Sequence, residues 1–295
     1  MTNPDLPSSP RPALSLPNRV RRVTVIRPPA FSLRVFDRAL AELWHYFDLL
    51  VTLTVHRVKV RYKQSILGPT WAVLQPLSLM LIYTVIFSHI ARMPSDGAPY
   101  AVFAYTALLP WTAFSTALTA ATTGITNHSD LVKKVYFPRE ILPISYVIAA
   151  IVDLVIASIV LTALLLYYHI PLTLNALYVF PIILVMMLFV TAIVLFFSAL
   201  QVRFRDVGVG MPLLLQLWMF ATPVIYPLSA VPRNLRPLYD LNPMVGVIEN
   251  FRRVVLQGVG PDFGSLLQAA LVALILLPIT YMFFKHVEAT MADVI

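Results

Sequence analysis

The sequence contains little charge and no cysteine. Of its 295 residues, 12% are Asp, Glu, Lys or Arg and 59% are hydrophobic. A soluble domain carries about twice that share of charge, so this chain cannot cover itself with a water-exposed surface. Without cysteine it has no disulfide, no thiolate metal ligand and no cysteine nucleophile. The composition therefore predicts an integral membrane protein.

The groups that catalysis and cofactor binding require are also scarce. None of the nine glycines is followed by lysine, so the phosphate-binding loop of P-loop ATPases is absent. The six histidines are scattered along the chain, which argues against a histidine metal cluster. We expect no catalytic residue, no metal and no cofactor on this chain, which is then not itself an enzyme. The net charge of +8 suggests contact with anionic membrane lipids rather than with nucleic acid.

What the chain has instead is long apolar stretches. A helix of about 20 apolar residues crosses the hydrocarbon layer of a bilayer. Six such stretches lie near residues 70–90, 100–125, 141–168, 174–202, 207–228 and 263–284. No alternating strand pattern suggests a barrel. We predict an all-α integral membrane protein with six transmembrane helices, forming a permease domain over residues 63–295.

The basic residues orient these spans. An even number of spans places both termini on one side of the membrane. All but five of the 22 Lys and Arg residues fall on that side; the five are Arg92, Arg233, Arg236, Arg252 and Arg253. Because basic residues concentrate on the cytoplasmic side, both termini are predicted to be cytoplasmic.

The segment before the first span divides into two parts. Residues 1–35 are rich in proline, serine and arginine, which predicts a disordered cytoplasmic tail. Residues 36–62 repeat apolar side chains at steps of three and four, which predicts an amphipathic helix in the cytoplasmic interface. This helix either only anchors the chain to lipid or also contacts a cytoplasmic partner.

Two loops carry patterns of their own. The cytoplasmic loop after the second span has Tyr136 and Phe137 between charged residues, and exposed aromatic side chains often mark interaction surfaces. On the outer side, residues 229–262 contain several Pro and Gly breakers around an amphipathic stretch at 245–256. We predict a short re-entrant or interfacial hairpin there, before the last span.

Polar residues inside the spans are few. Asp153 is the one charged residue within the six spans and is expected near the bilayer midplane. It serves either as hydrogen-bonding glue between helices or in transport. A run of small polar residues in the second span could line or pack a seam between two copies of the chain: Ser115, Thr116, Thr119, Thr122 and Thr123.

Six stretches resemble one family of membrane proteins. They are RYKQSILGPTWAVLQPL (61–77), LLPWTAFSTAL (108–118), LVKKVYFPREILP (131–143), QVRFRDVG (201–208), FATPVIYPLS (220–229) and LNPMVGVIENFRRVVL (241–256). Together they resemble the type-2 ABC exporter permeases, and more narrowly the subunits that export O-antigen, capsular polysaccharide or teichoic acid. The resemblance covers about residues 55–295.

The resemblance implies partners and roles. It implies a homodimer with two copies of a separate ABC ATPase, which binds ATP and Mg. It also implies that the loop between the second and third spans couples to the ATPase, through Leu131, Lys133, Lys134, Tyr136, Phe137, Pro138, Arg139 and Glu140. Aromatic side chains line the sugar path in this family, and the candidates here are Trp111, Phe114, Trp218, Phe220 and Tyr226.

The expected function follows. We expect a subunit of an ATP-driven exporter in the bacterial inner membrane that moves a lipid-linked polysaccharide, such as the O-antigen of lipopolysaccharide, to the outer face. The alternatives are a secondary transporter or channel that works without an ATPase, and a membrane-embedded glycosyl or acyl transferase. The identity of the polysaccharide and of its lipid carrier stays open.

Overall fold

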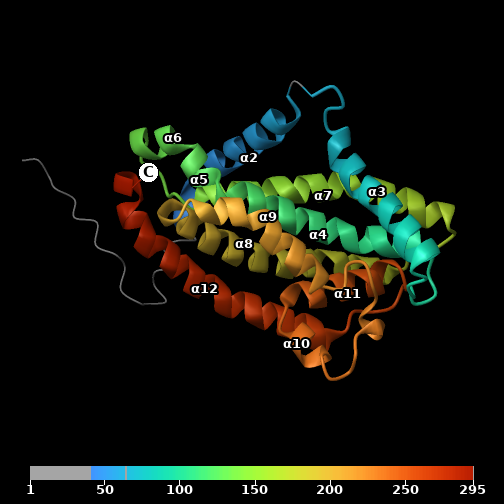
Figure 1. The fold of residues 1–295 in the computed structure, drawn as a ribbon. Coiled ribbons are helices and arrows are strands. Elements are labelled where there is room, and N and C mark those ends of the chain that lie inside the picture. Colours follow the sequence, from blue (N-terminus) through green and yellow to red (C-terminus); the bar gives the residue numbers. More distant parts are fainter. Residues whose placement is uncertain (1–40, 64, 295) are drawn as a thin grey trace, which may run out of the picture.

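A computed structural model describes residues 41–63 and 65–294 of the chain. The predicted disordered tail, residues 1–35, lies outside this part. All regular elements in the described ranges are helical, as predicted, and most of them run along one elongated bundle (Figure 1).

Five segments are long and apolar enough to cross a membrane, judged by length and composition within the described residues. The first, Thr70–Ile90, consists of α3 (Thr70–Tyr83) and the π-helix η1 (Thr84–Ile90). The others contain α4 (Tyr100–Thr122), α7 (Ile141–Tyr167), α8 (Val179–Arg203) with the 3-10 helix η2 (Leu174–Tyr178) before it, and α12 (Phe263–Val294). These five agree with five of the six predicted spans.

The remaining predicted span, 207–228, is shorter than expected. Its helix, α9 (Asp206–Phe220), has 15 residues, and turns and bends follow it. Pro223 and Pro227 explain this end, because proline lacks the backbone N–H that a continuing helix needs and also restricts the residue before it. A sixth crossing therefore stays a prediction.

α4 lies at the centre of the bundle. It packs against α7, α8, α11, α3 and α9, and its buried side chains form much of the main hydrophobic core. α12 packs along α8 over most of its length. The short helices α5 (Gly124–Asn127) and α6 (Ser129–Lys134) follow α4 and lie at the same end of the bundle as the C-terminus (Figure 1).

The predicted interface helix is present in part. Residues 41–45 are helical, and α2 (Phe47–Tyr62) follows them; residues 36–40 lie outside the described part. α2 packs against α7 and buries Leu50, Thr54 and Arg57. It is therefore attached to the bundle through polar as well as apolar side chains. Its position in the membrane interface stays a prediction.

Three short elements precede the last span: η3 (Leu228–Ala230), α10 (Arg236–Asp240) and α11 (Pro243–Val255). α11 begins where the Asn242 side chain accepts a hydrogen bond from the Met244 backbone N–H, with Pro243 in the first turn. α11 is buried against α4, α8 and α12. α10 and α11 lie at the end of the bundle opposite α6 (Figure 1). The predicted helix at 245–256 thus exists, while its insertion into the membrane stays a prediction.

Candidate functional site

A polar cavity of about 580 Å³ lies between α2, α3, α4 and α7. Most of the polar side chains that line it come from the spans themselves: Gln75, Thr112, Ser115, Thr116, Thr119 and Asp153. Arg61 and Tyr62, at the end of α2, and the half-exposed Trp71 of α3 complete this part of the lining. Polar groups inside apolar spans are costly unless they find partners, so such a lining marks a candidate site.

Asp153 has partners that the sequence did not reveal. Its carboxylate pairs with the Arg61 guanidinium and accepts a hydrogen bond from the Tyr62 hydroxyl at 2.6 Å. The sequence reading found no basic partner for Asp153 within the spans. The partner comes instead from α2, which reaches alongside α7. Both side chains of the pair are partly buried, and Asp153 joins two helices as the hydrogen-bonding interpretation predicts; a role in transport remains a prediction.

A second contact attaches α2 to α7. The Arg57 guanidinium lies over the Tyr146 ring, with its carbon 3.4 Å from the ring centroid, and its Nε donates to the Ser145 hydroxyl at 2.5 Å. Burial lowers the pKa of Arg57 while the nearby Tyr146 opposes this shift. Together with the Asp153 pair, this contact fixes α2 at two points along α7.

The predicted seam residues do not all share one environment. Ser115, Thr116 and Thr119 line the cavity. Thr122 is buried and donates to the Leu118 carbonyl at 2.6 Å. Thr123 is half-buried and does not line the cavity. Three of the five residues are therefore available at the cavity wall.

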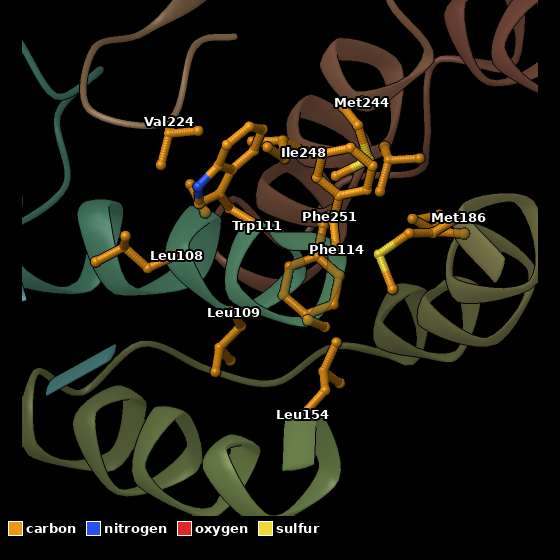
Figure 2. Packing of buried hydrophobic residues seen from close by; sticks show 14 of the residues in the cluster. Leu108, Leu109, Trp111, Phe114, Leu154, Met186, Val224, Met244, Ile248 and Phe251 are labelled. Carbon is orange, nitrogen blue, oxygen red and sulfur yellow. The ribbon is translucent and has the colours of Figure 1, made fainter. Parts of the chain in front are cut away.

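Three of the five aromatic channel candidates lie in the core of the chain. Trp111 and Phe114 are buried and extend from α4 among Ile248 and Phe251 of α11 (Figure 2). The Phe114 ring meets the half-buried Trp218 edge-on, with centroids 5.0 Å apart. In this structure these side chains serve packing, and a place along a sugar path stays a prediction for them.

Of the other two aromatic candidates, Phe220 is exposed and Tyr226 is half-buried. Phe220, the last residue of α9, is 51% exposed. The Tyr226 hydroxyl donates to the Phe220 carbonyl at 2.6 Å and lies 2.8 Å from the Tyr239 hydroxyl. Because Tyr239 belongs to α10, these contacts connect Phe220 and Tyr226 with that helix.

The predicted coupling loop has an exposed and a buried part. Lys133, Lys134 and Tyr136 are exposed, Tyr136 by 84%. Phe137 was expected beside Tyr136 on the surface, but it is buried with Pro138, and Phe137 packs in a second hydrophobic cluster that includes residues of α7, α8 and α12. The chain alternates sides at this turn, so adjacent aromatic residues face opposite ways. Leu131 is partly buried against the same cluster.

Arg139 and Glu140, at the end of the loop, bind α12. The Glu140 carboxylate is completely buried and lies 2.8 Å from the Lys285 ammonium group. Burial raises the pKa of Glu140, and the charge of Glu288 adds to that shift while Lys285 opposes it. Its place in a charged loop suggested that Glu140 faces outward toward a partner. The structure instead buries it against α12.

A buried arginine fixes the opposite end. Arg252 of α11 is 2% exposed, donates to the carbonyls of Pro223 and Val224 at 2.7 and 2.6 Å, and pairs with Glu249 at 3.1 Å. Its guanidinium lies 3.7 Å from the Phe103 ring centroid. Burial raises the pKa of Glu249 and lowers that of Arg252, and each charge opposes the shift of the other.

These contacts connect α11 with α4 and with the segment after α9. Sequence reasoning counted Arg252 as a loop charge and missed this role. The available signal was a basic residue on the apolar face of a predicted helix. A cavity of about 230 Å³ adjoins this cluster and is lined by Asp96, Glu249 and Arg252 among others.

The described residues offer no metal site, since no group of three or more His, Cys, Asp or Glu side chains is close enough to hold an ion. The chemistry of the site is therefore that of hydroxyl, amide, carboxylate and guanidinium groups, which bind by hydrogen bonds and charge.

Comparisons with known proteins give matches over most of the chain. Residues 48–256 match the family model described as ABC-2 type transporter. An O-antigen export system permease protein RfbA of Myxococcus xanthus is 33% identical over 242 residues, which cover 81% of this chain and 92% of that protein. An RfbA protein of Klebsiella pneumoniae is 31% identical over 74% of this chain and 84% of its own. A polysialic acid transport protein KpsM of Escherichia coli is 25% identical over 81% of this chain and 93% of its own.

Proposed function

The chain belongs to the ABC-2 type transporter family of membrane proteins, and from this premise we propose that it is the permease subunit of a polysaccharide exporter. The observation that carries the proposal is the similarity to O-antigen export permeases over 81% of this chain and 92% of the relative. The substrate proposed is a lipid-linked polysaccharide, most specifically an O-antigen, moved from the cytoplasmic to the outer face of the bacterial inner membrane.

The energy source is a separate ABC ATPase. Two copies of that ATPase, with ATP and Mg bound to them, drive two copies of this chain. The exposed part of the loop, Lys133, Lys134 and Tyr136, supports an ATPase contact, because an exposed aromatic ring with charges around it is typical of an interface. In this proposal the loop and both termini are cytoplasmic, and α9 with the residues after it provides the sixth crossing.

The sugar path lies where polar groups and unpartnered helix faces meet. The cavity beside α3 offers hydroxyl, amide and charged groups at the depth of the spans, together with the ring of Trp71. α3 is largely exposed in one copy, which leaves a face for a second copy of the chain. The exposed Phe220 and the half-buried Tyr226, at the outer end, are the aromatic candidates on which sugar rings can stack.

Export in cells tests the proposal. Deleting the gene should remove the polysaccharide from the cell surface and leave it lipid-linked in the cytoplasmic leaflet, and the intact gene should restore export. An inactive variant of the partner ABC ATPase should cause the same defect. Export that continues without any ATPase would instead support a secondary transporter or channel. Failure to synthesise the polysaccharide, rather than to export it, would support a transferase.

Purified protein provides the biochemical counterpart. The chain alone should hydrolyse no ATP, because it lacks a phosphate-binding loop. Crosslinking in native membranes should give a dimer of this chain, and co-purification should recover the ATPase with it. A monomer that is fully active in transport would contradict the two-copy arrangement.

A further inference from the structure

The predicted coupling loop is fastened to the last helix of the chain. Glu140, its final residue, is completely buried, and its carboxylate contacts Lys285 at 2.8 Å and accepts a hydrogen bond from the Tyr281 hydroxyl at 3.2 Å. Both partners belong to α12, about 140 residues further along the chain. The loop therefore meets α12 as well as α7, which it precedes directly.

The neighbouring residue makes the same connection. The Arg139 backbone N–H donates to the Glu288 carboxylate at 3.1 Å, and its guanidinium donates to the Glu288 backbone carbonyl at 2.5 Å. Glu288 also pairs with Lys285 at 2.9 Å. Because Tyr281, Lys285 and Glu288 are spaced by four and three residues, they lie on one face of α12. Two consecutive loop residues thus hold one face of a single helix.

Burial makes this joint stiff. Removing one partner of a buried ion pair leaves an uncompensated charge away from water, which is strongly destabilising. The side chains of Glu140 and Lys285 are 0% and 14% exposed. The loop contains a contrasting pair, Asp130 and Lys134, whose groups lie 3.7 Å apart and are mostly exposed. Exposed pairs of this kind contribute little, so the Asp130–Lys134 pair holds the loop much less firmly than the pair at Glu140.

The other end of α12 carries the outer helix. The Asn250 side chain of α11 donates to the Ser265 hydroxyl at 2.9 Å and accepts from the Asp262 backbone N–H at 2.6 Å. At Gly246 a Cβ atom would lie 2.9 Å from the Ser265 carbonyl oxygen, so α11 and α12 approach as closely as glycine allows. From Ser265 to Lys285 a helix extends about 30 Å at 1.5 Å per residue.

We propose that α12 transmits the movement of the 131–140 loop to the outer helix α11, with Arg139 and Glu140 as the positioning residues that join the loop to it. The proposal rests on the proposed function, in which this loop meets the ATPase. α12 continues as one helix from Phe263 to Val294, across Pro278. In this proposal a displacement at Glu140 reaches α11 along α12, without passing through the cavity. The outer end then opens in step with the nucleotide state of the partner.

The absence of cysteine allows a direct test. A single Gln257→Cys substitution places a thiol at an exposed position just after α11. The variant is reconstituted in proteoliposomes together with its partner ABC ATPase. The rate at which a membrane-impermeant maleimide labels this thiol is then measured with and without vanadate-trapped nucleotide. We expect trapping to change the rate in the parent. In Glu140→Gln that change should fall by at least about fivefold, as for the loss of a coupling free energy between sites, while ATPase co-purification stays unchanged.

Matched variants separate transmission from simple packing. Asp130→Asn removes the exposed Asp130–Lys134 pair of the same loop and should preserve the nucleotide response. Exchanging the charges, Glu140→Lys with Lys285→Glu, should restore part of the response that Glu140→Gln loses. If Glu140→Gln fails to insert, Arg139→Lys replaces it, since this variant keeps every charge but loses the guanidinium that donates to the Glu288 backbone carbonyl. The backbone N–H of residue 139 still donates to the Glu288 carboxylate. The response in Arg139→Lys should then fall as well.

The outcomes also separate this inference from the proposed function. A full nucleotide response in Glu140→Gln, or in Arg139→Lys where that variant replaces it, overturns the role of α12 and leaves the permease assignment intact. A parent that binds the ATPase and exports, but whose outer thiol never responds to nucleotide, overturns it too. A parent that binds no ATPase and exports without one contradicts the proposed function itself.

Discussion

Two spans of similar length, α4 and the segment α3–η1, occupy opposite situations. In the most apolar 18-residue window of α4, 83% of the residues are buried inside the chain, against 11% for Thr70–Ile90. α4 packs against α3, α7, α8, α9 and α11, whereas α3 buries only Pro76 and Met80. Hydrophobicity alone therefore does not distinguish a central helix from a peripheral one in a membrane protein, because lipid accepts apolar side chains as readily as the core does.

The backbone of the α3–η1 segment is also less regular than that of a continuous α-helix. α3 contains Pro76, and it continues into a π-helix at Thr84–Ile90, where the Ala91 N–H bonds to the Ile86 carbonyl. π-helical turns are rare in proteins, and those that do occur are often found at functional sites. The polar cavity also lies on the α3 side of the bundle. The comparison teaches that α4 provides the fixed core, while α3 presents the face that lipid or a second copy covers.

The largest expected effect concerns the core side of this comparison. Phe114→Ala in α4 removes a ring that is 0% exposed and should destabilise the protein by about 3–5 kcal/mol. Leu81→Ala in α3, where the side chain is 57% exposed, should cost under about 1 kcal/mol, because surface changes are mild. Thermal unfolding of the detergent-solubilised monomer measures both. Equal losses of stability in the two variants would contradict the distinction between a central α4 and a peripheral α3.

A smaller effect is expected where α2 meets α7, beside the cavity. Asp153→Leu strands the Arg61 guanidinium and the Tyr62 hydroxyl and should destabilise by about 2–3 kcal/mol, less than for a fully buried pair since both side chains are partly exposed. Asp153→Asn keeps a hydrogen-bond acceptor and should cost about 1 kcal/mol. Unfolding and export assays on both variants decide the role of this residue. If both variants fold and dimerise normally but neither exports, Asp153 acts in transport and not as a structural hydrogen-bonding residue.

Phe137 and Tyr136, which are adjacent in the loop, show the same contrast between a buried and an exposed position. Phe137→Ala empties a buried site and should lower stability. Tyr136→Ala should leave stability unchanged, since Tyr136 is 84% exposed, but should weaken ATPase binding by about tenfold, a loss of about 1.4 kcal/mol typical of an aromatic interface residue. The two effects are measured separately, the loss of stability by unfolding the isolated chain and the loss of binding by the affinity for the ATPase. Unchanged affinity in Tyr136→Ala would place the coupling surface elsewhere.

Much of the architecture was predictable from the sequence because charge is excluded from the spans. The limits of five apolar helices follow from that rule, and the outer helix follows from Asn242–Pro243 and the later glycines. The shortening of α9 was harder, since its apolar pattern continues through Pro223. Pro110 lies inside α4 and Pro212 inside α9, whereas α9 ends before Pro223. A proline in an apolar stretch therefore does not by itself tell from the sequence where the helix ends.

The site was predictable in its parts but not in its pairings. Asp153, Glu140 and Arg252 were all visible as charges, yet their partners are far away in the sequence: Arg61, Lys285 and the carbonyl of Pro223. Such pairs depend on which helices become neighbours, and periodicity does not specify that. The same holds for Tyr136 and Phe137, since the sequence marks both as aromatic but only the packing of α12 and α7 decides which one is covered.

The smallest expected effect belongs to Lys133. Its side chain is exposed near the end of α6, where a single rim charge contributes little to the stability of the chain. Lys133→Ala should change the free energy of unfolding by under about 0.5 kcal/mol. If the loop meets the ATPase, the variant should slow association and alter its salt dependence more than it alters affinity, since rim charges act mainly on the encounter. Binding kinetics at two ionic strengths, compared with Tyr136→Ala, measure this difference. A loss of affinity as large as that of Tyr136→Ala would mean that charge, and not the aromatic ring, dominates the contact with the ATPase. The exposure of the aromatic side chain would then no longer predict where the binding energy of the loop lies.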